Sequence, residues 1–171
     1  MFPADEMYLV YKDDLLDLMD IYFEICGAGY QDIFRISMDI HTADDFVLAM
    51  NSDLNLLYSI KRVTDDGEGN ERCGVFWLNR FMGNSCFLHF CGFNTQFSRK
   101  YAIPIGKFVL EWVHGKFHTV FACIPSSNRR LRLFVRKLSF KRACNLPSLF
   151  YISSEERADC ELWYKTGGLH D

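Results

Sequence analysis

Hydrophobic spacing predicts a short strand followed by two helices at the start of the chain. Residues 6–11 alternate loosely between polar and apolar side chains, which is typical of a short strand. From Leu15 to Ile25, apolar residues recur at helical spacing, between a cluster of aspartates and two glycines that favour a helix start and end. Thr42 and Asp45 resemble a capping box, so we expect a second helix over residues 43–52.

Three strand patterns follow, and strong turn signals separate them. Residues 54–63, 73–81 and 85–93 are rich in apolar and aromatic side chains. The first turn reads Asp-Asp-Gly-Glu-Gly-Asn over residues 65–70, and the second reads Met-Gly-Asn over residues 82–84. Because consecutive strands with short turns pair side by side, the pattern predicts an antiparallel meander.

Helical and strand patterns alternate in the rest of the chain. Residues 103–113 carry helical spacing, residues 118–124 form an apolar strand pattern, and residues 127–138 are again helical. Two more strands are predicted at about 148–152 and 159–165.

The composition indicates that the predicted elements form a single domain. The chain has 171 residues, of which 49% are hydrophobic and 16% aromatic, enough for one sizeable core. We therefore expect a single domain over residues 1–171. The apolar runs are too short to span a bilayer and the N-terminus does not resemble a signal peptide, so we expect no membrane partner and a cytoplasmic location.

Cysteines and histidines do not form a metal-binding pattern. The seven cysteines lack a Cys-x-x-Cys pair and mostly sit in apolar runs, which favours reduced thiols packed as small hydrophobic groups. The five histidines lack the regular spacing of zinc ligands. We predict no structural metal.

Charge is divided unevenly along the chain. Residues 1–71 contain sixteen acidic and four basic side chains, whereas residues 72–171 contain fifteen basic and six acidic ones. The helix over 127–138 places Arg129, Arg132 and Arg136 on one face, opposite an apolar face. These arginines form either a solvated outer face or a contact for a phosphate-bearing ligand. Nucleic acid is unlikely as a partner because the whole chain has a net charge of −3.

The stretch from His118 to Phe140 resembles the end of the core of GNAT acyl-CoA transferases. It has an apolar strand ending at Pro125, Asn128 near a helix start, and then Phe-Val-Arg-Lys-Leu-Ser-Phe over residues 134–140. The order of the predicted elements extends this resemblance over nearly the whole chain. It implies an α+β (α/β/α) fold with a mixed, mostly antiparallel sheet of about six to seven strands, a splayed parallel pair, and about four helices.

The resemblance also implies acetyl-CoA or CoA as the coenzyme, bound between the two splayed strands, with a helix start near Gly106 facing the diphosphate. The phosphate loop of the family is degenerate here, since only Gly106 of its glycine pattern is present and Pro104 offers no N–H. Nearby basic residues could replace the missing donors. The coenzyme-binding residues implied are Phe90, Cys91, Gly92, Phe93, Arg99, Lys100, Ile105, Gly106, Lys107, Phe108, Asn128 and Phe134.

Catalytic residues are less well marked. The tyrosine that commonly protonates the departing thiolate in GNAT enzymes is replaced by Val135, which has no proton to give. His89 and Cys91 alternate onto one strand face near the expected splay and are the candidates for proton transfer, although a histidine in a strand is more often a packing residue. Loss of a general acid slows such a reaction without abolishing it, because a thiolate is a fairly good leaving group.

A narrower resemblance connects the chain with poorly characterised GNAT-like proteins of phages and prophages. It rests on Leu-His-Phe at 88–90, Ile-Gly at 105–106, and the motifs around Asn128 and Phe134. Three functions therefore stay open: an N-acyltransferase acting on an unknown amine, an inactive GNAT-fold assembly or binding protein, or a nucleic-acid-associated protein that uses the arginine-rich helix. A homodimer and a phage assembly partner are both compatible with the many aromatic residues.

Overall fold

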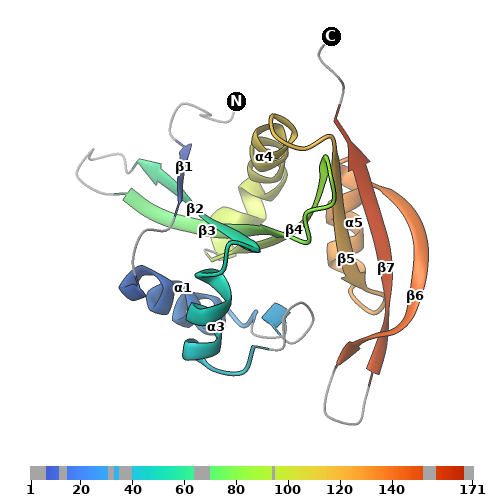
Figure 1. Cartoon of the computed structure of the whole chain (residues 1–171). Coiled ribbons are helices and arrows are strands. Elements are labelled where there is room, and N and C mark those ends of the chain that lie inside the picture. Colours follow the sequence, from blue (N-terminus) through green and yellow to red (C-terminus); the bar gives the residue numbers. More distant parts are fainter. Residues whose placement is uncertain are drawn as a thin grey trace.

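The computed structural model describes residues 7–11, 15–30, 33–34, 40–63, 70–93, 95–151 and 157–167. Along the chain the elements are β1 (Met7–Tyr11), α1 (Leu15–Gly27), α3 (Ala43–Met50), β2 (Asn55–Val63), β3 (Asn70–Asn79), β4 (Ser85–Gly92), α4 (Thr95–His114), β5 (Thr119–Pro125), α5 (Arg129–Lys137), β6 (Lys141–Tyr151) and β7 (Arg157–Thr166) (Figure 1). The predicted turn at 65–70 lies outside the described residues, apart from Asn70.

The strands form one seven-stranded sheet in the order β1-β2-β3-β4-β5-β7-β6. Helices α1 and α3 cover one face, where Leu18, Phe46 and Trp77 belong to one buried cluster. Helices α4 and α5 cover the other face, where Val109 and Val135 belong to a second buried cluster. The predicted α/β/α architecture with a mixed, mostly antiparallel sheet is confirmed.

Local signals set several element boundaries as predicted. The side chain of Thr42 accepts a hydrogen bond from the Asp45 amide at 3.1 Å, and the Asp45 carboxylate accepts one from the Thr42 amide at 2.9 Å. This capping box starts α3 and lowers the pKa of Asp45, chiefly through its hydrogen bond with Thr42. Between β3 and β4, Gly83 adopts a φ of 57°, a conformation that favours glycine.

Two predicted boundaries are wrong. Helix α4 begins at Thr95, well before the expected start at residue 103. Pro104, whose fixed φ suits a first helical turn, lies inside this helix instead. Strand β6 begins at Lys141, directly after α5, rather than near residue 148.

Candidate functional site

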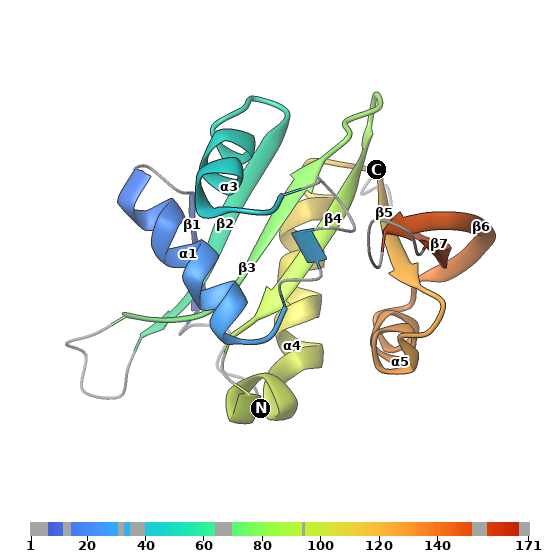
Figure 2. The same cartoon turned by 90° about the horizontal axis from the view of Figure 1, so that it is seen from below.

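Strands β4 and β5 are the parallel pair, and they stay together only at their beginnings. Pairing covers Ser85 with Thr119, Cys86 with Val120, and Phe87 with Phe121. The carbonyl of Asn84 holds the start of β5 through the amides of His118 and Thr119, at 2.9 and 3.2 Å. Beyond these pairs the two strands diverge (Figure 2). The splayed parallel pair expected from the sequence is therefore present.

The divergence leaves part of the β4 backbone facing the gap. Phe93 donates its amide N–H to Cys73 of β3 at 3.1 Å, and backbone direction alternates along a strand. The N–H and C=O groups of Leu88, Phe90 and Gly92 consequently point away from β3, toward β5. Since β5 does not pair with β4 after Phe121, these groups have no strand partner on that side among the described residues.

One pair of aromatic rings lies at the closed end of this gap, and another lies on one of its sides. At its closed end, the rings of Phe87 and Phe121 stack with 5.3 Å between centroids. On the side of α4 and α5, the Phe90 ring contacts that of Phe134 at 5.9 Å. Phe134 belongs to α5, so this contact connects the half of the molecule carrying β4 with the half carrying β5.

The expected phosphate loop is part of a continuous helix. Ile105, Gly106, Lys107 and Phe108 lie in the interior of α4, where backbone N–H groups bond to carbonyls one turn earlier. Gly106 is buried against α5, and a Cβ there would lie 2.8 Å from a Leu138 methyl carbon. Close helix packing accounts for this glycine. The amides left without a partner in a helix are those of its first turn, which here begins at Thr95.

The basic residues near this helix lie in different surroundings. Lys107 is exposed, and the ammonium of Lys100 lies 4.9 Å from the ring centre of Tyr101. The side chain of Arg99 lies outside the described residues.

Asn128 starts helix α5. Its side-chain oxygen accepts a hydrogen bond from the Leu131 amide at 3.0 Å, which is a typical N-cap. The N-cap role predicted for this residue is confirmed. The same side chain carries an NH₂ group, which can donate hydrogen bonds to another acceptor.

The two candidate proton-transfer residues lie on the other face of the sheet, toward α1 and α3. The His89 ring stacks on Trp77 with 4.8 Å between centroids, and its Nε2 lies 3.1 Å from the side-chain oxygen of Asn79. Burial, with a smaller contribution from the charge of Arg80, lowers the pKa of His89 to about 3. Cys91 is only 2% exposed, and burial raises its pKa. Neutral imidazole and protonated thiol are the forms present near pH 7.

The position of the missing tyrosine is part of the core. Val135 is 5% exposed and packs in the cluster between the sheet, α4 and α5. An apolar residue there supports the packing of α5, and it offers no group that could protonate a thiolate.

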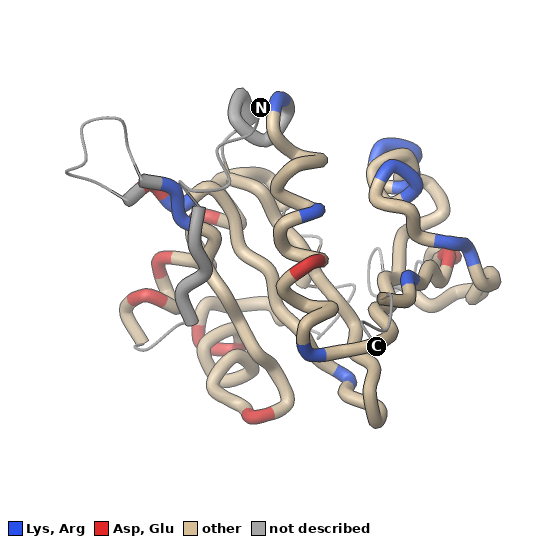
Figure 3. Tube along the Cα trace, turned by 90° about the horizontal axis from the view of Figure 1, so that it is seen from above, with Lys and Arg blue, Asp and Glu red and all other residues tan. Residues whose placement is uncertain are grey.

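Several acidic residues of the first half form contacts within the protein. Arg72 of β3 forms ion pairs with Asp17 and with Glu24 of α1, the latter at 2.8 Å. Asp45 belongs to the capping box described above. Figure 3 shows acidic residues gathered on α1 and α3 and basic residues on α5.

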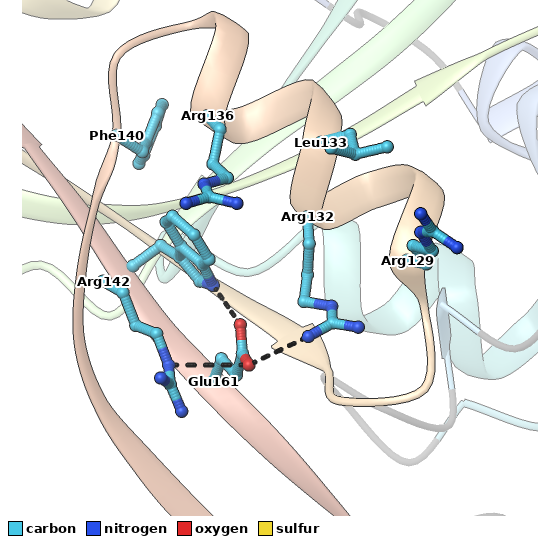
Figure 4. Close-up of a pocket in the computed structure, with 8 residues that line it drawn as sticks. Arg129, Arg132, Leu133, Arg136, Phe140, Arg142 and Glu161 are labelled. Atoms are coloured by element: carbon cyan, nitrogen blue, oxygen red, sulfur yellow. Dashed lines mark hydrogen bonds and ion pairs between the residues drawn. The ribbon is translucent and has the colours of Figure 1, made fainter.

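A concave region lies on the far side of α5. Its polar lining consists of Arg129, Arg132 and Arg136 of α5, Arg142 of β6 and Glu161 of β7 (Figure 4). The arginines of α5 were marked by the sequence. Arg142 and Glu161 were missed, because only the pairing of β6 with β7 brings them under the helix.

No helix in the part of the chain that the structure describes is long and apolar enough to cross a membrane. Over the same residues, no group of three or more His, Cys, Asp or Glu is arranged to hold a metal ion. All seven cysteines are free thiols.

Solved structures similar to this chain include GNAT acetyltransferases. A spermidine N-acetyltransferase SpeG chimera from Vibrio cholerae and hSSAT superimposes with a TM-score of 0.74 at 12% identity, covering 94% of this chain and 95% of that one. Spermidine N-acetyltransferase from Vibrio cholerae, in complex with CoA and spermine, gives 0.72 at 11% identity, with 95% and 96% covered. A GNAT-family acetyltransferase from Bacillus anthracis gives 0.69 at 13% identity, with 94% and 95% covered.

The protein therefore has the GNAT fold along nearly its whole length, as the sequence predicted. No protein-family model matches the sequence, and no curated protein sequence matches it significantly.

Proposed function

We propose that the protein is an acyl-CoA-dependent N-acyltransferase that transfers an acetyl group from acetyl-CoA to an amine. The observation that carries this proposal is the parallel pair β4 and β5, which separates after Phe87 and Phe121 and leaves β4 backbone groups facing the gap. The GNAT fold of the chain, and a structural neighbour solved with CoA and spermine, support the same coenzyme class.

In this proposal the pantetheine arm lies along β4, and the N–H groups of Phe90 or Gly92 polarise the thioester carbonyl. The amine attacks that carbonyl directly, so that a C–N bond forms and the C–S bond breaks. The thiolate departs without a proton from the protein, because Val135 has none, and the proton of the amine passes to water. Rate enhancement then comes from positioning and oxyanion stabilisation, and turnover is slow.

The coenzyme diphosphate needs a different contact from the one the sequence suggested. We propose that it meets the first turn of α4, which begins at Thr95 close after β4, because amides near Gly106 already lie inside the helix. Lys100 and Lys107, both exposed on α4, supply positive charge along the same helix.

A second candidate is a GNAT-fold protein without turnover, such as a phage or prophage assembly protein. The contact between Phe90 and Phe134 favours it, since these rings join the two halves across one side of the gap. The cytoplasmic location and a homodimeric state stay predictions.

Calorimetric titration with CoA and acetyl-CoA separates the two candidates. Saturable binding of both, followed by acetylation of added amines detected by mass spectrometry, is the result expected of the enzyme. Free CoA is best followed by chromatography, because the seven cysteines of the chain react with thiol reagents. Failure of both ligands to bind overturns the enzyme proposal; binding without product from a broad amine panel favours the inactive protein.

A further inference from the structure

The concave region beyond α5, named here the arginine pocket, holds more positive charge than the protein itself neutralises. Four arginines, at 129, 132, 136 and 142, line a cavity of about 510 Å³ that contains a single acidic group, Glu161. Figure 4 shows Arg132 and Arg142 reaching Glu161 from opposite sides. A volume of this size is in the range of small-molecule sites.

Glu161 is held in place without satisfying these arginines. Its side chain is 7% exposed, and one of its carboxylate oxygens accepts a hydrogen bond from the Trp163 indole at 3.0 Å. The other oxygen lies 3.4 Å from Arg132 and 3.5 Å from Arg142. Charge-assisted pairs with good geometry are about 2.7–2.9 Å long, so both contacts are loose. Arg142 also donates a hydrogen bond to the side-chain oxygen of Asn145, and the remaining guanidinium N–H groups of the four arginines can donate to another acceptor.

One of these groups is buried. The Nε of Arg132 has no hydrogen-bond partner and is shielded from solvent. A buried N–H of a charged group without a partner is costly, and the cost disappears when an anion occupies the pocket. For Arg129 and Arg136, no carboxylate within the described ranges lies at ion-pair distance.

We propose that the arginine pocket binds a small phosphate-bearing molecule, a phosphate monoester or a diphosphate. Planar guanidinium groups match the oxygens of a phosphate group, and several of them converge here. The apolar rim formed by Leu133, Phe140 and Trp163 suits the organic part of such a ligand.

The pocket is separate from the gap proposed for the coenzyme. Its lining comes from α5, β6, β7 and the turn at Phe140, whereas the gap lies between β4 and β5. Two faces of α5 serve the two places: Phe134 contacts β4, and Arg132 faces β7. A concave site of about 510 Å³ fits a compact anion better than the extended backbone of a nucleic acid.

The test is calorimetric titration of the full chain with inorganic diphosphate, alone and after saturation with CoA. We expect one saturable site whose affinity falls with added salt. Arg132→Gln and Arg142→Gln each lower the affinity on the order of tenfold, since each removes charge-assisted hydrogen bonds. Arg130→Gln is the matched control, because Arg130 is an exposed arginine of the same helix that does not line the pocket.

Four results overturn the proposal. The first is no saturable binding of diphosphate or of a phosphate monoester at millimolar concentration. The second is an equal loss of affinity in Arg130→Gln, which indicates general charge attraction. The third is that CoA competes with diphosphate in the original chain but no longer competes in Arg132→Gln. That result assigns the pocket to the coenzyme. The fourth is that a DNA or RNA oligonucleotide binds more tightly than diphosphate and loses this binding in the same variants. The ligand of the pocket is then nucleic acid rather than a small anion. Folding of each variant is checked by its thermal transition.

Discussion

The ring of Phe90 on β4 lies against the ring of Phe134 on α5, with 5.9 Å between their centroids and 24° between their planes. This pair is a direct side-chain contact between the two halves that the splayed strands separate. We expect a coenzyme that enters the gap from the side of α4 and α5 to part these two rings. Separating the two rings therefore costs free energy when the coenzyme enters.

Phe134→Leu is expected to raise the affinity for CoA about two- to tenfold. An aromatic pair of this kind is worth about 0.5–1.5 kcal/mol, and leucine removes it while keeping an apolar wall. Calorimetric titration gives the affinity, with Leu133→Met on the exposed neighbouring position as the control.

Phe90→Leu should have the same effect as Phe134→Leu, and the double variant should gain little more, because both changes break one contact. Weaker CoA binding in Phe134→Leu would contradict this account and make Phe134 part of the pantetheine wall.

Gly106→Ala is expected to destabilise the fold by ~1 kcal/mol. The new methyl would lie 2.8 Å from Leu138 and 3.0 Å from Phe134, so α4 and α5 would have to move apart. Overpacking of this kind costs about 1–3 kcal/mol, which the better helix propensity of alanine offsets only in part.

Urea unfolding measures the change at Gly106. Gly27→Ala is the control, because it too lies in a helix and a Cβ there meets nothing within 4 Å. That control should gain about 0.5 kcal/mol. Equal gains at both positions would show that the approach of α4 to α5 at Gly106 is not tight.

Sequence patterns predicted the elements whose signals are local. The capping box at Thr42 and Asp45, the cap at Asn128 and the glycine turn at Gly83 each depend on a few neighbouring residues, and the structure contains all three. Strands β2, β3 and β4 were predicted because each combines apolar residues with a clear turn signal at an end.

The start of α4 and the first half of β6 were missed for physical reasons. Residues 95–100 are mostly polar, and Pro104 favours a helix start over a helix interior. Strand β6 lies at the edge of the sheet and includes Pro147, two irregularities in pairing, and a positive φ at Ser148. Such features are tolerated at an edge and resemble a loop in the sequence.

The arrangement of the candidate sites depends on contacts between distant residues. Glu161 faces Arg132 because β7 pairs with β5 on one side and β6 on the other, and α5 crosses that surface. The pKa of His89 is lowered chiefly by burial, to which Trp77 of the neighbouring strand contributes by stacking on the ring. Neither relationship has a signature in the local sequence.

Asn128→Ser is expected to lower the affinity for CoA on the order of tenfold while leaving the stability nearly unchanged. Serine can accept the hydrogen bond from Leu131 and preserve the cap, but it lacks the NH₂ group through which Asn128, an implied coenzyme-binding residue, would contact CoA. Asn128→Ala is the companion variant, which loses the cap as well and about 1 kcal/mol of stability.

Calorimetry and urea unfolding on both Asn128 variants separate the two roles. If Asn128→Ser binds CoA as tightly as the original chain, the asparagine serves only as a helix cap.

The lowered pKa of His89 predicts that the fold loses stability in acid, and a variant at this position separates its contribution from the others. Its pKa is lowered from 6.5 to about 3 in the folded protein, so between these values the unfolded chain binds more protons than the folded one. Stability from this group is complete above pH 6.5 and is lost as the pH falls, by at most about 1.4 kcal/mol per pH unit. The physical cause is that protonation would place a charge between Trp77 and the core.

Urea unfolding between pH 7 and pH 4.5 measures this loss, and His89→Gln should make the profile flatter than that of the original chain. His114, whose pKa is also lowered by burial, acts in the same direction in both proteins, so it cancels when the two profiles are subtracted. Identical slopes would mean that His89 takes up a proton in the folded state near its ordinary pKa. The imidazole would then be available for proton transfer near neutral pH, and the assignment of His89 as a neutral packing residue would be wrong.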